Sequence, residues 1–83
     1  MITHEQIETL IRAALPDAIV ETADRTGTLD HYNLSVVSRQ FDGMPLLDRN
    51  RLIYSALGDA LRDGRLHAVE IKTGTPVQGA DRP

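Results

Sequence analysis

Two strand-like patterns lie on either side of one long helical pattern, and this arrangement constrains the fold more than any other feature of the chain. Residues 31–38 and 67–72 alternate polar and apolar side chains as strands do. The apolar residues between them repeat at helical spacing and form a stripe of Ile53, Leu57, Ala60 and Leu61. Two strands joined by a helix are parallel when they are neighbours in a sheet, and the crossover is right-handed in nearly all cases. We therefore expect a sheet that contains a parallel pair.

A first helix precedes this unit. Thr3 followed by Gln6 fits a capping box, and an apolar stripe at helical spacing follows it. Pro16 ends the pattern, because the residue before a proline avoids the helical region. We expect this helix over about residues 3–15.

A hairpin is expected next. Residues 18–23 form a weakly alternating run, and residues 24–28 have turn chemistry in which Gly27 is able to take a positive φ. With the strand over residues 31–38 they predict an antiparallel pair. The expected sheet therefore has three strands and is mixed.

The second helix has start and stop signals of its own. Residues 39–47 form a connector that contains Gly43. Asp48 stands where an N-cap belongs, ahead of a helix that runs to about residue 63, and Gly64 suits the position after its end. The order of elements is α-β-β-α-β, which belongs to the α+β class.

The end of the chain reads differently from the rest. Residues 73–83 have almost no apolar content, so we expect disorder there. We place one domain at residues 1–76 and a disordered tail at residues 77–83. A chain of 83 residues leaves no room for a second core.

The composition argues against several classes of function. The chain has no cysteine, which removes disulfides, thiolate nucleophiles and all-cysteine metal sites, and its net charge of −3 argues against broad contact with a phosphate backbone. No nucleotide-binding glycine pattern, nucleophile elbow or carboxylate pair spaced for acid–base work is present, so we expect a protein without enzymatic activity. No apolar run is long enough to span a bilayer and the first residues lack a signal-peptide pattern, so we expect a cytoplasmic protein.

The expected topology brings two histidines to one edge of the sheet. His31 opens the second strand and His67 opens the third, and parallel strands begin at the same edge. Imidazole is a good ligand for borderline metals. Two imidazoles leave a tetrahedral site half empty, so a metal site at this edge would be shared with another protein rather than completed within the chain.

One stretch carries a combination of residues that points to a family. It contains Phe41-x-Gly43, the basic element Arg49-x-Arg51, a helix, and a His67-Ala pair at the next strand. This combination is similar to the signature of the BolA family, and the resemblance extends over about residues 4–76. It implies the family's class II KH-like fold, with an extra helical turn around residues 43–47 before the second long helix. Within that fold Phe41 would plug the end of the core and Gly43 would allow a tight turn.

The resemblance also implies a shared iron–sulfur cluster. BolA proteins pair with CGFS-type monothiol glutaredoxins and hold a [2Fe–2S] cluster, with the glutaredoxin cysteine and glutathione ligating on one side and BolA residues on the other. His67 matches the family's C-terminal histidine, and His31 matches the histidine of its short-loop members. Two other roles stay open, since His31 also suits a strand start bonded to the turn and His67 suits a half-buried position bonded to backbone. The small size and the half-complete site favour a monomer when the protein is alone.

BolA proteins have also been viewed as DNA-binding regulators, and this is the alternative function. Arg49 and Arg51 would then contact DNA, although Asn50 replaces the histidine that the family usually has between them. Four arginines of this region are opposed by three aspartates, which leaves one positive charge for phosphate contact. The same arginines also suit a solvated helix face or a docking surface for an acidic partner.

Overall fold

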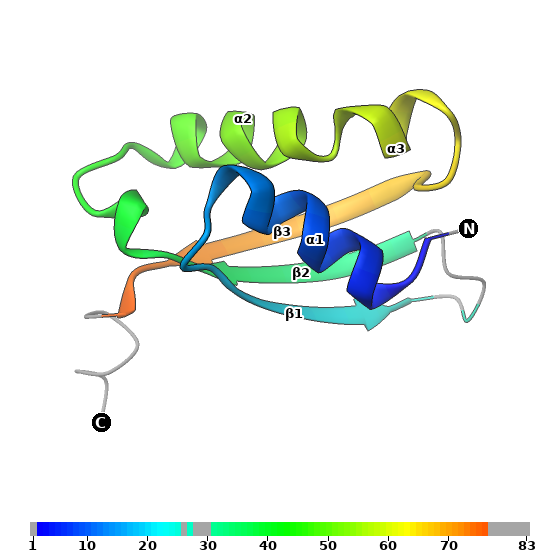
Figure 1. The fold of residues 1–83 in the computed structure, drawn as a ribbon, viewed down its shortest axis with the longest axis horizontal. Helices are drawn as coiled ribbons and strands as arrows, with labels where there is room; N and C mark the ends of the chain where they lie inside the picture. The colour runs from blue at the N-terminus through cyan, green and yellow to red at the C-terminus, as the bar shows by residue number, and fades with distance from the viewer. Residues whose placement is uncertain (1, 26, 28–30, 77–83) are drawn as a thin grey trace.

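The computed structural model describes residues 2–25, 27 and 31–76, and the tail predicted at residues 77–83 lies outside them. The elements are, in chain order, α1 (His4–Ala14), β1 (Ile19–Asp24), β2 (His31–Val37), the 3₁₀ turn η1 (Arg39–Phe41), α2 (Leu46–Ala56), α3 (Gly58–Arg62) and β3 (Ala68–Gly74). The helices cover one face of the sheet, and none of them lies on the other face (Figure 1). The predicted α+β class is confirmed, whereas the likeness to class II KH domains stays a prediction.

The sheet has the predicted mixed topology. Its strand order is β1-β2-β3, with β1 antiparallel to β2 and β2 parallel to β3. α2 and α3 make the connection between the parallel strands, as the sequence pattern required. The register places His31 beside Ala68 and Leu34 beside Ile71, so both strands begin at one edge.

The core lies between the sheet and the helices. Tyr32, Leu34 and Val36 point inward from β2, and the Tyr32 hydroxyl donates to the Ile2 carbonyl at 2.6 Å. Phe41 is fully buried in the connection between β2 and α2, and Gly43 follows with a φ of 76°. The buried apolar residues are Ile2, Ile7, Ile11, Leu15, Ala18, Val20, Tyr32, Leu34, Val36, Phe41, Ile53, Leu57, Ala60 and Leu66.

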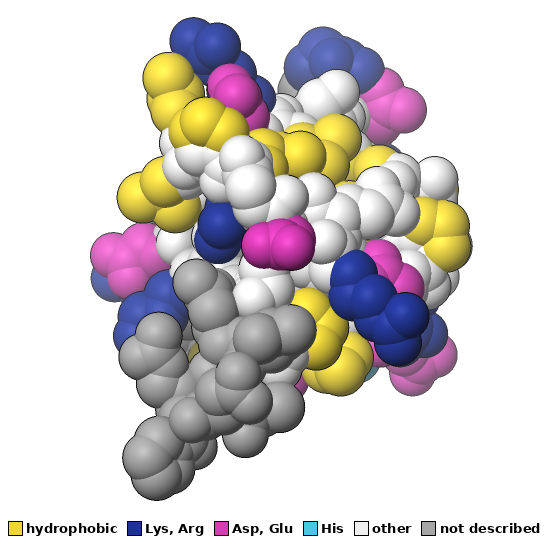
Figure 2. Space-filling model, turned by 90° about the vertical axis from the view of Figure 1, so that its left-hand side faces the viewer, with side chains coloured by type: hydrophobic (Ala, Val, Ile, Leu, Met, Phe, Trp, Pro, Cys, Tyr) yellow, Lys and Arg dark blue, Asp and Glu magenta, His cyan; other side chains and the backbone are white. Residues whose placement is uncertain are grey.

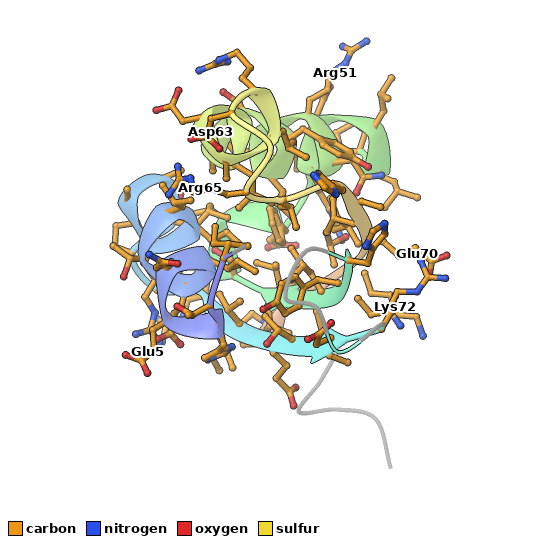
Figure 3. The ribbon with its side chains drawn as sticks, turned by 90° about the vertical axis from the view of Figure 1, so that its right-hand side faces the viewer. Glu5, Arg51, Asp63, Arg65, Glu70 and Lys72 are labelled. Carbon is orange, nitrogen blue, oxygen red and sulfur yellow. The ribbon has the colours of Figure 1, made fainter. Side chains whose placement is uncertain are left out.

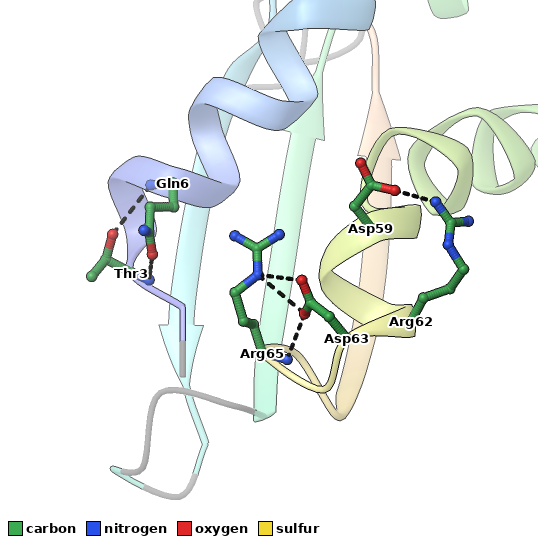
Figure 4. A network of polar contacts seen from close by, with 6 residues as sticks. All are labelled: Thr3, Gln6, Asp59, Arg62, Asp63 and Arg65. Carbon is green, nitrogen blue, oxygen red and sulfur yellow. Dashed lines mark hydrogen bonds and ion pairs between the residues drawn. The ribbon is translucent and has the colours of Figure 1, made fainter.

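The predicted start of the first helix is confirmed. The Thr3 hydroxyl accepts a hydrogen bond from the Gln6 N–H at 3.2 Å, and the Gln6 side chain accepts one from the Thr3 N–H at 2.9 Å (Figure 4). This reciprocal pair is the capping box that the spacing indicated. The helix ends at Ala14, with Leu15 as its C-cap.

The second helix differs from the prediction in its start and in its course. It begins at Leu46 with Pro45 as N-cap, because the proline ring fixes φ at −60° just before the first turn. Asp48 is therefore not the N-cap but a first-turn residue, where its charge interacts favourably with the helix dipole. The single helix predicted to residue 63 is interrupted at Leu57, whose ψ is 2°, and Gly58 follows as a poor helix former.

The extra helical turn lies earlier than predicted. It is η1 rather than residues 43–47, because the buried Ser38 hydroxyl caps η1 by accepting a hydrogen bond from the Gln40 N–H at 3.1 Å. The φ of 76° at Gly43 then turns the chain toward α2 instead of continuing a helix.

The last strand also has different ends. It starts at Ala68, one residue after His67, and continues to Gly74, so residues 73 and 74 belong to a strand and not to a disordered tail. Pairing with β2 explains the extension, because Val36 and Val37 lie opposite these residues and the Ser38 N–H donates to the Gly74 carbonyl at 3.1 Å. The polar composition of residues 73 and 74 led to the wrong prediction of disorder there.

A carboxylate clamp joins the loop after α1 to the end of β2. Asp17 accepts a hydrogen bond from the Ser38 hydroxyl at 2.6 Å and another from the Arg39 N–H at 2.8 Å. The Ser38 bond first, and the Arg39 N–H second, hold the pKa of Asp17 below its ordinary value of 3.8. The hydrogen bonds therefore stabilise the ionised carboxylate of Asp17 in the folded chain relative to the unfolded chain.

We predict that this clamp makes stability depend on pH. A folded pKa below 3.8 means that Asp17 contributes stability at neutral pH and that this contribution is lost as pH falls through the folded pKa. Urea unfolding should therefore show Asp17→Asn to be less stable than the native chain at pH 7, with the difference shrinking at about pH 3. Asp42→Asn, in the exposed turn after η1, is the matched control. A difference for Asp17→Asn that stays constant from pH 7 to pH 3 would refute the clamp.

Candidate functional site

The parallel pair brings two histidine rings together. His31 is the first residue of β2, and His67 immediately precedes Ala68, the residue that lies opposite His31. The ring centroids are 5.8 Å apart and the ring planes are inclined by 80°, an edge-to-face arrangement. The meeting of the two rings at one edge, which the topology predicted, is therefore present in the structure.

Both rings are reachable from solvent. His31 is half-buried and His67 is exposed. The backbone beneath them is fixed, because the Arg25 N–H donates to the His31 carbonyl at 2.8 Å. Buried Leu66, just before His67, donates its N–H to the Ala60 carbonyl at 3.1 Å. The two rings thus lie at a sheet edge whose backbone is held by hydrogen bonds.

The turn that leads to His67 is held by a local ion pair. The Asp63 carboxylate accepts from the backbone N–H of Arg65 at 3.0 Å and from its guanidinium at 2.9 Å (Figure 4). The backbone N–H, followed by the side chain, lowers the pKa of Asp63 below its ordinary value. Gly64 has a φ of 83°, as the predicted residue after the helix, and a Cβ there would lie 3.9 Å from the His67 Nε2.

The donor set at this edge is incomplete for a metal ion. Among residues 2–25, 27 and 31–76, no group of three or more histidine, cysteine, aspartate or glutamate side chains is placed to hold one. Two imidazoles supply half of a tetrahedral coordination shell. Asp30 lies outside the described residues. His4, the third histidine, is on α1, where its Nδ1 lies 2.8 Å from the Thr22 hydroxyl.

The structure separates the two arginines of the basic element. The Arg49 Nε donates to the Met44 carbonyl at 2.8 Å, and the guanidinium carbon lies 5.6 Å from the centre of the Phe41 ring. Arg49 therefore fastens the connector to the start of α2. Arg51 is exposed and extends away from the ribbon (Figure 3).

Sequence reasoning passed over one group of surface residues. Leu46 and Leu47 were assigned to a connector, yet they form the first turn of α2 and are largely exposed. Two adjacent leucines directly after Pro45 could have indicated an exposed apolar residue. A buried stripe occupies only one side of a helix, so it does not use two consecutive positions equally.

No helix in the described part of the chain is long and apolar enough to cross a membrane.

Residues 8–78 match the BolA family, described as BolA-like protein. The uncharacterized protein RP812 of Rickettsia prowazekii is 32% identical over 87% of this chain and 92% of its own length. BolA-like protein 1 of Mus musculus is 34% identical over 93% of this chain, which spans only 64% of the mouse protein.

A solved structure supports the same assignment. The crystal structure of a bol-like protein from Babesia bovis superposes with a TM-score of 0.79 and 30% identity, over 99% of this chain and 96% of that one. The α+β architecture, the match over most of the sequence and this superposition agree, and the chain belongs to the BolA family.

Proposed function

We propose that this protein is a non-enzymatic accessory protein of iron–sulfur metabolism that pairs with a CGFS-type monothiol glutaredoxin and co-ligates a shared [2Fe–2S] cluster through His67 and His31. The observation that carries the proposal is the 5.8 Å approach of two solvent-reachable imidazole rings at one sheet edge. Family membership supports it, because pairing around such a cluster is what the resemblance to BolA proteins implies. The BolA family is not known as a family of enzymes.

The chemistry of the donors fits a shared site. Imidazole ligates iron in Rieske centres, where two histidines replace two cysteines on one iron and raise its potential. This chain has no cysteine, so thiolate ligands would come from the glutaredoxin and from glutathione. A half-complete site is consistent with a monomer that pairs on demand, and a cytoplasmic setting is part of the same proposal.

The two histidines are expected to contribute unequally. His67 is the more exposed, and it stands one residue before the regular strand. His31 is half-buried and its carbonyl is tied to Arg25. We therefore expect His67 to be the stronger ligand of the pair.

We predict the effect of each histidine on a reconstituted cluster. When the chain is mixed with a CGFS glutaredoxin, glutathione, iron and sulfide, the visible circular dichroism should differ from that of the glutaredoxin alone. His67→Ala should shorten the lifetime of this signal about tenfold, and His31→Ala should shorten it less, because a lost ligand weakens metal holding. His4→Ala is the control and should leave the signal unchanged, because the His4 ring contacts the Thr22 hydroxyl and is not a member of the pair.

Two results would contradict this proposal. One is a spectrum identical to that of the glutaredoxin homodimer, together with the absence of a heterodimer in size-exclusion chromatography. The other is a cluster of unchanged lifetime in the His31→Ala/His67→Ala double variant, which would leave the pairing intact but assign the ligation to other residues.

The alternative, a DNA-binding regulator that uses Arg49 and Arg51, has less support from the geometry. Arg49 is engaged with Met44 and Phe41, so Arg51 is the arginine of the element that extends freely. A single projecting arginine supplies little of the phosphate contact on which DNA affinity depends.

The division between the two arginines is itself testable. Arg49→Gln should lower the free energy of unfolding by about 1–3 kcal/mol, because it removes a charge-assisted hydrogen bond and a cation–π contact. Arg51→Gln should change it by less than about 0.5 kcal/mol, as exposed substitutions do. Urea titration of both variants measures the difference, and equal effects would show that Arg49 has no special structural role.

A further inference from the structure

α2 exposes an apolar patch that starts in its first turn, at the end of the sheet opposite the histidines. Leu46, Leu47 and Tyr54 are 63%, 59% and 45% exposed, and they are three of the four exposed large hydrophobic side chains of the described chain. α2 begins at the left of Figure 1, whereas β2 and β3 begin at the right. Figure 2 views the left-hand end and shows hydrophobic side chains exposed around its upper part. Scattered apolar residues are ordinary on a surface, but three on one short helix form a patch.

The patch follows a regular line on the helix. Leu47, Arg51 and Tyr54 are four and three residues apart, so they are neighbours on the helix surface. Leu46 lies beside Leu47 in the first turn, about two helical turns before the fully buried Ile53 and on the same side of α2. We call Leu46, Leu47, Arg51 and Tyr54 the α2 outer face.

Arg51 is the basic side chain of the α2 outer face, and the exposed Asp48 lies three residues before it in the first turn. Arg51 extends away from the ribbon in Figure 3 and makes no ion pair with any described residue. The neighbouring arginines differ, because Arg62 pairs with Asp59 and Arg65 pairs with Asp63 (Figure 4). An unpaired guanidinium among apolar side chains is suited to a carboxylate of another molecule.

A second copy of the chain fits this face poorly. Two copies related by a two-fold axis would pack α2 against α2 in opposite directions, with Leu47 of one copy near Tyr54 of the other. Arg51 lies about midway between these residues along the helix, so it would face its own copy across the axis. Like charges placed together oppose association in this arrangement, which favours an unlike partner.

Nucleic acid fits the α2 outer face poorly as well. Binding to a phosphate backbone needs several basic groups, and this face has one. Leu46, Leu47 and Tyr54 offer apolar contact instead, on a chain whose net charge is −3. Apolar anchors around a single arginine are typical of protein interfaces, where tyrosine and arginine are enriched.

We propose that the α2 outer face docks an acidic amphipathic helix of a partner protein. Apolar side chains of that helix cover Leu46, Leu47 and Tyr54, and one of its carboxylates pairs with Arg51. The proposal is independent of the shared cluster, because α2 begins at the end of the sheet opposite to the one where β2 and β3 begin and where the histidines lie.

Two synthetic helical peptides test this proposal against the whole chain. Both carry the same leucine stripe, flanked by glutamates in one peptide and by lysines at the same positions in the other. In a heteronuclear NMR titration, the glutamate peptide should shift the resonances of residues 46–54 saturably and bind about fivefold or more tightly than the lysine peptide. Arg51→Glu should reverse this preference, and Leu47→Ser should weaken both peptides.

The controls separate a specific site from general charge attraction. Lys72→Glu reverses an exposed basic residue on the open face of the sheet and should leave the preference unchanged. Circular dichroism confirms that each variant is folded, which is expected because Arg51 and Leu47 are exposed. A preference that persists in Arg51→Glu, or shifts confined to another surface, would overturn the proposal. So would a concentration-dependent dimer in sedimentation that Leu47→Ser abolishes, since that result would assign the face to a second copy.

Discussion

The parallel pairing of β2 with β3 is the constraint on which the rest of this structure depends. A parallel pair requires a crossover, and α2 and α3 supply it across one face of the sheet. The same pairing sets His31 beside Ala68 and so brings His67 within contact of the His31 ring. It also makes α2 begin at the end of the sheet opposite to the one where β2 and β3 begin (Figure 1). Both candidate surfaces therefore follow from one topological choice.

The corner between β2 and α2 turns that topology into a rigid frame. Phe41 is fully buried there, the guanidinium of Arg49 lies over its ring, and Arg49 also binds the Met44 carbonyl. The Asp17 clamp holds the other side of the same corner through Ser38. These contacts explain why the two arginines of the basic element differ. Arg49 binds within the corner, whereas Arg51 stays exposed on the surface.

The sequence predicted those features that depend on local chemistry or on topology. The capping box at Thr3, the positive φ at Gly64 and the shared edge of the histidines all follow from residue spacing or from strand direction. Some of the features that it missed depend on contacts between distant residues, since the β3 extension to Gly74 needs β2 beside it. Others are local, such as the start of α2 after Pro45 and the break at Leu57, which occurs in a helix whose apolar pattern runs on without interruption. The bond from Ser38 to Asp17 joins segments that no local pattern relates.

The separation of the two surfaces has a thermodynamic consequence. Substitutions at distant sites without shared partners have additive effects on free energy, whereas residues in contact are coupled. His31 and His67 are in contact, so the effects of changing them should not be additive. Arg51 shares no contact with either histidine in the described chain, so changes at Arg51 and at the histidines should be additive. Under the two proposals the domain would hold its partners at separate places, and neither binding event would need to alter the affinity of the other.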